Sequence, residues 1–103
     1  MKMSDLIKTA EKEVLRKEIL GLCYKAAPAG CSMDVLAAAF AHSGTGDKEE
    51  IARQVDYLEA KQLVSAQTVG NKQLGISRTI VKLTAKGTDY MEGNADQLAG
   101  IGE

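Results

Sequence analysis

The chain has 103 residues, a length that suits one domain of ordinary size and leaves no room for a second. Apolar residues make up 45% and charged residues 26%, a composition that indicates a globular protein with its own core and argues against wholesale disorder. The formal charge of −1 excludes a uniformly polybasic nucleic-acid binder, so any binding of anions has to be local.

The first predicted element is a long helix that Ser4 caps and that residues 28–30 end. Apolar side chains recur along it at three- and four-residue spacing and predict one buried stripe: Val14, Leu15, Ile19, Leu22, Cys23 and Ala26. Leu6, Ile7 and Ala10 lie several turns before the dense part of this stripe. We expect these three residues to project beyond the compact body and to serve a protein partner or a second copy of the chain.

A second and a third helix are predicted on either side of a polar, glycine-bearing break over residues 42–46. Ser32 is a suitable cap for the second, whose apolar positions are Val35, Leu36, Ala39 and Phe40. Asp47 and Glu50 have the spacing of a capping box and start the third. Its core-facing positions are Ile51, Val55 and Leu58, and its opposite face carries Lys48, Glu49, Ala52, Arg53 and Asp56. Two helices joined in this way predict a helix-turn-helix.

A β-hairpin follows, because residues 63–69 and 77–84 are short runs with Val, Ile and Thr on either side of a glycine-bearing turn. Alternation along the second run predicts that Arg78, Ile80 and Lys82 share one face, and that Thr79, Val81 and Leu83 share the other. Thr84 is a suitable cap for a last helix that includes Tyr90 and Met91 and stops at Gly93 and Asn94. We expect one domain over residues 1–94 and a flexible tail over residues 95–103.

The charges of the hairpin region differ in sign from those of the third helix. Residues 61–86 contain five cations and no acid. We expect the five cations to form a local basic face: Lys61, Lys72, Arg78, Lys82 and Lys86. Residues 47–59 carry five acids against two cations, Lys48 and Arg53, which is unusual for a helix that enters a DNA groove. The hairpin is therefore the stronger candidate for phosphate contact.

Compartment and chemistry are predicted from what the sequence lacks. No run of about 18 apolar residues and no signal-like N-terminus occur, so we expect a cytoplasmic protein with no membrane partner. Cys23 and Cys31 are the only cysteines and His42 is the only histidine, so we expect buried structural thiols, with redox sensing as the alternative, and neither a metal nor a cofactor. No catalytic constellation is present at usable spacing, and we expect no enzyme.

Three segments resemble the winged helix-turn-helix superfamily over about residues 13–93. IARQVDYLEAKQLV resembles the recognition helix and first wing strand of small MarR-like proteins, and ISRTIVKLTAKGTDYMEG resembles the second wing strand and the helix that follows it. Together with LRKEILGLCYKAAPAGCSMDVLAAAF, they are similar to small winged-helix proteins of Mu-like prophages. The resemblance implies an α+β, helix-rich fold with three helices, a two-stranded wing and a C-terminal helix.

The resemblance also implies a function. Winged helices typically place the third helix in the major groove of double-stranded DNA and the wing against its backbone, and many dimerise, so a phage or bacterial transcription regulator that acts as a homodimer is expected. The candidate DNA-binding residues are Lys48, Arg53, Lys72, Gln73, Arg78 and Lys82. The alternative is a winged-helix module for protein–protein interaction, which would dock a partner through Leu6, Ile7, Ala10 and the acidic third helix.

Single residues in this prediction have plainer interpretations. Arg53 could instead pair with Glu49 or Glu50 at helical spacing, and the hairpin cations could simply protect an edge strand from unwanted pairing. Tyr57 and Tyr90 could stack on unpaired bases, but core packing is the commoner role of tyrosines at helical spacing.

Overall fold

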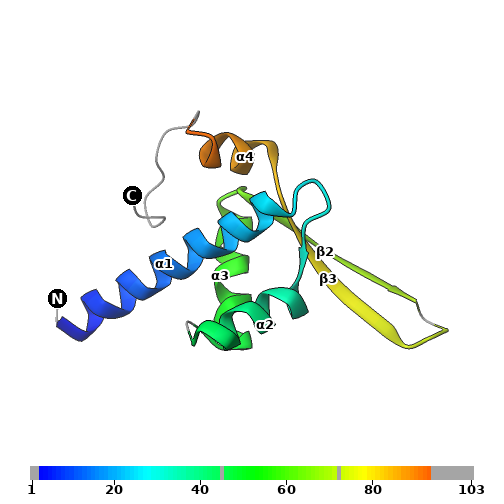
Figure 1. The fold of residues 1–103 in the computed structure, drawn as a ribbon, viewed down its shortest axis with the longest axis horizontal. Coiled ribbons are helices and arrows are strands. Elements are labelled where there is room, and N and C mark those ends of the chain that lie inside the picture. The colour runs from blue at the N-terminus through cyan, green and yellow to red at the C-terminus, as the bar shows by residue number, and fades with distance from the viewer. Residues whose placement is uncertain (1–2, 45, 72, 94–103) are drawn as a thin grey trace.

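Over the residues that the structure describes, the protein is an α+β domain of four helices and one three-stranded antiparallel sheet (Figure 1). The computed structural model describes residues 3–44, 46–71 and 73–93. The elements are α1 (Met3–Lys25), β1 (Cys31–Ser32), α2 (Met33–Ser43), α3 (Lys48–Ala60), β2 (Val64–Asn71), β3 (Ile76–Leu83) and α4 (Ala85–Met91). Residue 94 and the predicted tail over 95–103 lie outside the described residues.

The predicted hairpin is present as β2 and β3, which pair from Val64 opposite Leu83 to Asn71 opposite Ile76. The sheet also has a third strand that we did not predict. β1 pairs Cys31 with Val81 and Ser32 with Ile80, which gives the order β1-β3-β2. A strand of two residues is too short to show the alternating pattern of a strand in the sequence, and it is recognised only by its pairing with β3.

Helices α1, α2 and α3 enclose the core together with the first part of the hairpin. The buried apolar residues are Leu15, Ile19, Leu20, Cys23, Cys31, Leu36, Phe40, Ile51, Val55, Leu58, Leu63, Val64 and Val81. The predicted α1 stripe is right for Leu15, Ile19 and Cys23 but wrong for Val14, which is 51% exposed. Val14 lies nine residues before Cys23, which places the two side chains on opposite sides of α1. Leu20, which the predicted stripe did not include, is buried in the core.

Side-chain caps fix the starts of three helices where the sequence predicted them. Ser32 Oγ accepts a hydrogen bond from the Val35 amide at 3.1 Å, Asp47 Oδ1 from the Glu50 amide at 2.8 Å, and Thr84 Oγ1 from the Gly87 amide at 3.0 Å. The prediction that Ser4 caps α1 is wrong, because the helix already includes Met3 and Ser4 therefore lies within it.

Helix α4 packs closely on the chain where α3 leads into β2. A Cβ at Gly87 would lie 2.0 Å from the Leu63 carbonyl oxygen, so only glycine fits there. Thr84 strengthens this junction, because its hydroxyl donates to the Gln62 carbonyl at 2.6 Å and its amide donates to the Leu63 carbonyl at 3.1 Å. These contacts fasten the start of α4 to the connection between α3 and β2.

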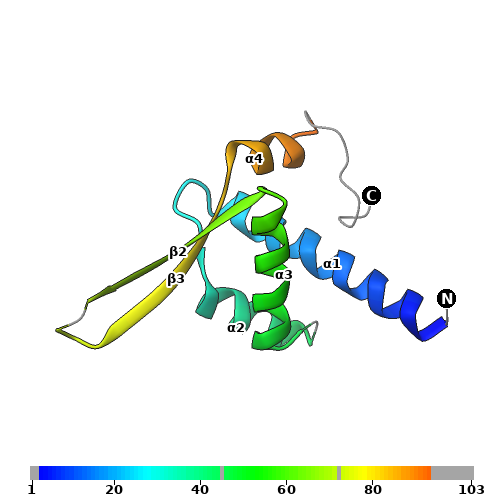
Figure 2. The ribbon, with the colours of Figure 1, turned by 180° about the vertical axis from the view of Figure 1, so that it is seen from behind.

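Two parts of the chain extend away from this body on opposite sides. Figures 1 and 2 show the N-terminal half of α1 reaching out on one side and the distal half of the β2–β3 hairpin on the other. Among the described helices, none combines the length and the apolar character needed to cross a membrane.

Candidate functional site

The β-hairpin presents two cations on the face that points away from the core. Val81 is buried against the helices, so the alternating positions Arg78 and Lys82 stand on the outer face, as predicted. Across the ladder, Arg78 lies opposite Val69 and Lys82 lies opposite Ser65. Both side chains belong to exposed residues. The outer face therefore carries two solvent-accessible positive charges on one strand.

These two charges have no acidic partner among the residues that the structure describes. No described carboxylate lies within ion-pair distance of Arg78 or Lys82, and the sequence has no acid between Lys61 and Lys86. An unpaired, hydrated cation keeps its charge available for an external anion, because it need not first leave a carboxylate.

The end of the hairpin is held by a turn that the asparagine side chain organises. Asn71 Oδ1 accepts hydrogen bonds from the amides of Gln73 at 3.0 Å and Leu74 at 3.2 Å, and Gly75 takes the left-handed conformation with φ +64°. Gln73 is exposed beside this turn. The predicted contact residue Lys72 lies outside the described residues.

The other cations of the predicted basic face are placed differently. The Lys61 ammonium lies 5.6 Å from the centroid of the Tyr57 ring, and Tyr57 belongs to α3 and packs against the core. Lys86 is exposed in the first turn of α4. The basic group that the hairpin itself assembles among the described residues is therefore the pair Arg78 and Lys82.

Helix α3 holds its two cations near acids. The Arg53 guanidinium donates from Nε to Glu50 Oε2 at 2.7 Å and forms an ion pair with the same oxygen through a second nitrogen. The hydrogen bond and charge of Glu50 raise the pKa of Arg53. The Lys48 ammonium nitrogen lies 4.0 Å from Oδ1 of Asp34 in α2. The plainer interpretation of Arg53, a pair with Glu50, is the arrangement that the structure contains.

A polar network that the sequence did not reveal ties α3 to α1. Arg16 Nε donates to Gln54 Oε1 at 2.6 Å, and Gln54 Nε2 donates to Glu50 Oε1 at 3.2 Å. The Arg16 guanidinium also lies 3.7 Å from the Tyr57 ring centroid, in cation–π contact. Arg16 and Gln54 are 38 residues apart, and nothing in their local sequence indicates that they meet.

The two tyrosines considered for base stacking are engaged in packing. Tyr57 and Tyr90 are both partly buried and pack against the core, and the Tyr57 ring already has Arg16 over its face. This arrangement agrees with the commoner role of tyrosine at helical spacing.

The distal half of the hairpin also exposes apolar side chains. Val69 is 47% exposed, Leu74 68% and Ile76 50%. By the register of the ladder, Val69 and Ile76 lie on the same outer face as Arg78. The projecting hairpin thus combines positive charge with an accessible apolar surface.

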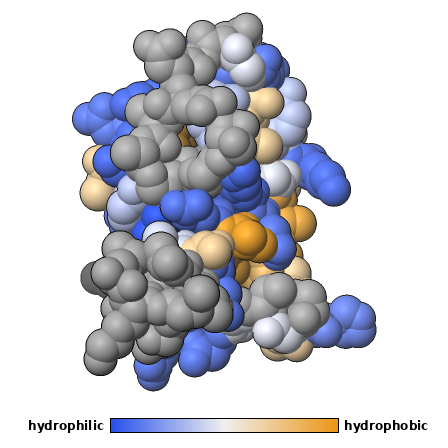
Figure 3. Space-filling model, turned by 90° about the vertical axis from the view of Figure 1, so that its left-hand side faces the viewer, coloured by the Kyte–Doolittle hydropathy of each residue, from blue (hydrophilic) through white to orange (hydrophobic). Residues whose placement is uncertain are grey.

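The residues predicted to serve a partner lie at the other end of the molecule. Ala10 is exposed on α1, whereas the side chains of Leu6 and Ile7 lie outside the described residues. Figure 3 views the molecule from this side, and its coloured surface is mostly hydrophilic around a small apolar patch.

Both cysteines are free and buried, as predicted. Cys23 Sγ lies 3.6 Å from the Val81 carbonyl oxygen, and Cys31 Sγ lies 3.6 Å from the Leu22 carbonyl oxygen. The two thiols therefore join α1 to the sheet as part of the core.

Comparisons with protein-family models, with curated proteins and with solved structures found no match to this chain.

Proposed function

We propose that the chain is a winged-helix protein that binds double-stranded DNA, as a phage or bacterial regulator, through its β-hairpin. The order helix, strand, helix, helix, strand, strand, helix supports this, because a winged helix has the same succession with its wing formed by the last two strands. The observation that carries the proposal is the pair Arg78 and Lys82, exposed on one face of a projecting hairpin with no described acid beside them.

The hairpin would bind the phosphate backbone. Four residues along a strand separate Arg78 from Lys82, which corresponds to about 13 Å, so the two side chains would reach different phosphates. Each contact displaces condensed counterions from the duplex, and the exposed side-chain amide of Gln73 adds a neutral donor at the turn. Affinity would then depend strongly on salt and weakly on base sequence.

Helix α3 would orient the protein more than it reads bases. Arg53 would have to exchange Glu50 for a guanine, and the exposed acids Glu49 and Asp56 on the same helix would repel nearby phosphates. We therefore assign most of the binding free energy to Arg78 and Lys82, and a smaller share to Lys48 and Arg53.

The proposal is tested by fluorescence anisotropy with a duplex of about 30 base pairs, titrated at several salt concentrations. Arg78→Ala and Lys82→Ala should each weaken binding and reduce the slope of log K against log salt by about 0.9, the value for one lost phosphate contact. Lys17→Ala, which removes an exposed charge from α1, is the matched control and should leave the slope unchanged. Equal affinity of the hairpin variants and the wild type would contradict the proposal.

A protein-interaction module is the second candidate, and the hairpin's exposed apolar residues favour it. Val69, Leu74 and Ile76 offer a surface that a protein partner could cover, and α3 presents its acids to solvent. Absence of duplex binding by the wild type at low salt would favour this candidate over DNA binding.

A further inference from the structure

The end of the β-hairpin gathers large apolar side chains that stay exposed to water. Leu74 in the turn is 68% exposed, the highest value among the large apolar residues that the structure describes, and Val69 and Ile76 are exposed as well. By the register of the ladder, Val69 and Ile76 share the outer face with Arg78. The hairpin therefore ends in apolar side chains beside a cation, and covering them with a ligand would remove apolar surface from water.

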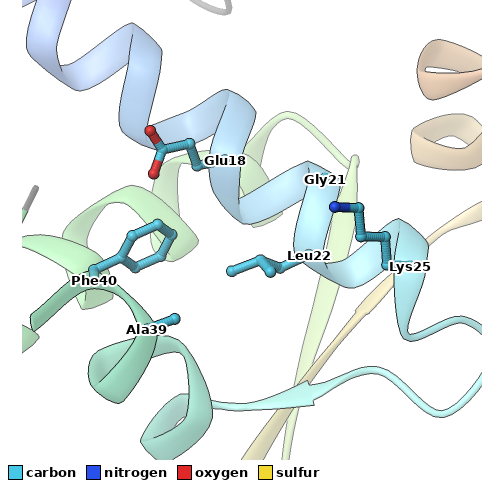
Figure 4. A pocket seen from close by; sticks show the side chains of 6 residues that line it. All are labelled: Glu18, Gly21, Leu22, Lys25, Ala39 and Phe40. Atoms are coloured by element: carbon cyan, nitrogen blue, oxygen red, sulfur yellow. The ribbon is translucent and has the colours of Figure 1, made fainter. Parts of the chain in front are cut away.

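A groove between α1 and α2 also has apolar lining, but its side chains belong to the core. Figure 4 shows Leu22 of α1 pointing toward Phe40 of α2 across this groove. Phe40 is only 2% exposed, and Leu22 is partly buried and packs against the core. The groove therefore offers a ligand less apolar surface than the end of the hairpin does.

Leu74 is held in position by the turn itself. Its amide donates to Asn71 Oδ1 and to the Asn71 carbonyl, each at 3.2 Å. Asn71 Oδ1 also accepts from the Gln73 amide at 3.0 Å, and Gly75, at φ +64°, supplies the left-handed residue that returns the chain to β3. Because the backbone that carries Leu74 is already ordered, inserting its side chain into a ligand costs little conformational entropy.

The inner face of the distal hairpin is thin. Thr68 and Thr79 face each other there with their hydroxyl oxygens 3.1 Å apart, and Gly70 lies opposite Ser77. A Cβ at Gly70 would lie 2.7 Å from the Ile76 carbonyl oxygen, so the strand has no room for a larger residue. The distal hairpin is thus a thin ribbon whose larger described side chains stand on the outer face.

This ribbon has the length to reach the floor of the DNA minor groove but is too wide for a regular one. Ile76 lies two residues nearer the turn than Arg78, about 7 Å along β3, and the minor groove is about 7.5 Å deep. With Arg78 at the phosphates on the rim, the turn reaches the bases. Two strands about 4.8 Å apart occupy roughly 8 Å or more with their own atoms, whereas the minor groove of B-DNA is about 6 Å wide. The ribbon therefore enters only where the groove opens.

The apolar end is too small to hold a protein partner by itself. A stable protein interface takes about 800 Å² and at least about 20 residues from each partner, far more than three side chains beside Arg78 supply. A wedge between two base pairs needs only one or two apolar side chains, and leucine and isoleucine are among the residues that serve in this way.

We propose that Leu74 is a DNA-bending wedge, an inference that rests on the proposed function. The hairpin end enters the minor groove, and Leu74 inserts between two adjacent base pairs. The partial unstacking bends the duplex toward the major groove and opens the minor groove, which admits the ribbon with Val69 and Ile76. The preferred ligand is therefore DNA that unstacks easily, at flexible pyrimidine–purine steps or at a mismatch.

Energy transfer between dyes at the two ends of a duplex of about 30 base pairs measures the bend, and anisotropy measures affinity. Binding of the wild type should raise the transfer efficiency. The wild type should also bind a duplex with a central mismatch at least tenfold more tightly than the matched duplex, because the mismatch already weakens stacking. Leu74→Ser should abolish both effects but keep the slope of log K against log salt, since Arg78 and Lys82 still meet phosphates.

Two further variants separate the wedge from folding and from general apolar character. Leu74→Met keeps an apolar side chain of similar volume and should still bend the duplex. Val35→Ser removes an apolar side chain of 56% exposure from α2 and should leave both the bend and the mismatch preference unchanged. The thermal unfolding midpoint of Leu74→Ser should equal that of the wild type, because Leu74 lies outside the core.

The possible failures of the wedge and of the proposed function differ. Duplex binding without a rise in energy transfer, or a bend that persists in Leu74→Ser, would overturn the wedge, leave the phosphate contacts standing and favour a protein partner for the apolar end. Absence of duplex binding by the wild type at low salt would contradict the proposed function and the wedge together.

Discussion

At Cys23, the environment of one side chain determines how it responds to pH. The thiol is fully buried at the contact between α1 and β3. Burial, and next the nearby Cys31 thiol, raises the pKa of Cys23 from 9.0 to about 12. Burial also raises the pKa of Cys31. Since the thiolate is the reactive form, both side chains are poor redox sensors at neutral pH, and their structural role follows.

This shift predicts a loss of stability in alkali. Between pH 9 and about 12, the Cys23 thiol ionises in the unfolded chain but stays protonated in the folded protein. The unfolded state then binds fewer protons, so the free energy of unfolding falls as pH rises through this range. Urea unfolding between pH 7.5 and 10.5, with reductant present, should show this fall in the wild type and a shallower one in Cys23→Ala. Identical slopes for the two proteins would contradict the assignment.

At the scale of the elements, local features of the sequence were the predictable ones. The caps at Ser32, Asp47 and Thr84 each bind an amide only three residues later in the sequence, and the strands of the hairpin have a side-chain period of two residues. Both features can therefore be recognised within a short stretch of sequence. The exposed Val14 and the strand β1 were not predictable, because each is decided by what packs against it from elsewhere in the chain. Near the candidate site, alternation predicted that Arg78 and Lys82 share one face of β3, which the unbroken ladder supports, whereas the position of Lys61 depended on Tyr57.

The link between α1 and α3 gives a prediction of its own. Gln54 is only 4% exposed and joins Arg16 of α1 to Glu50 of α3 through its amide group. Gln54→Ala removes an acceptor from Arg16 and a donor from Glu50, and should lower the free energy of unfolding by about 1–3 kcal/mol. Urea denaturation measures the change. Gln67→Ala on the exposed part of β2 is the matched control and should change the free energy of unfolding little. An equally small change for Gln54→Ala would show that the network adds no stability.

In the whole molecule, the buried core and the proposed DNA-binding residues lie in different parts: the core in the helical body and most of the candidate contacts on the hairpin. The body contains all the buried apolar residues described. The hairpin contributes Val64 and Val81 to them, and the partly buried Ala66 and Leu83 pack against the same core near the base of the hairpin. The distal hairpin carries Arg78 and the exposed apolar residues Val69, Leu74 and Ile76. It projects from the body on the side opposite the N-terminal half of α1 (Figure 1). Stability and the proposed DNA contact should therefore be separable.

Shortening the hairpin tests that separation. Gln67 and Ile80 face each other in the ladder, so an Asn-Gly turn can join them in place of residues 68–79. Because no buried core residue is removed, the thermal unfolding midpoint should fall by less than about 8 °C, which corresponds to roughly 1 kcal/mol. Duplex affinity, measured by anisotropy, should fall at least tenfold, since the candidate contacts Lys72, Gln73 and Arg78 are lost while Lys82 remains. A shortened protein that unfolds would assign the hairpin a structural role, and one that binds DNA as tightly as the wild type would move the phosphate contacts to another surface.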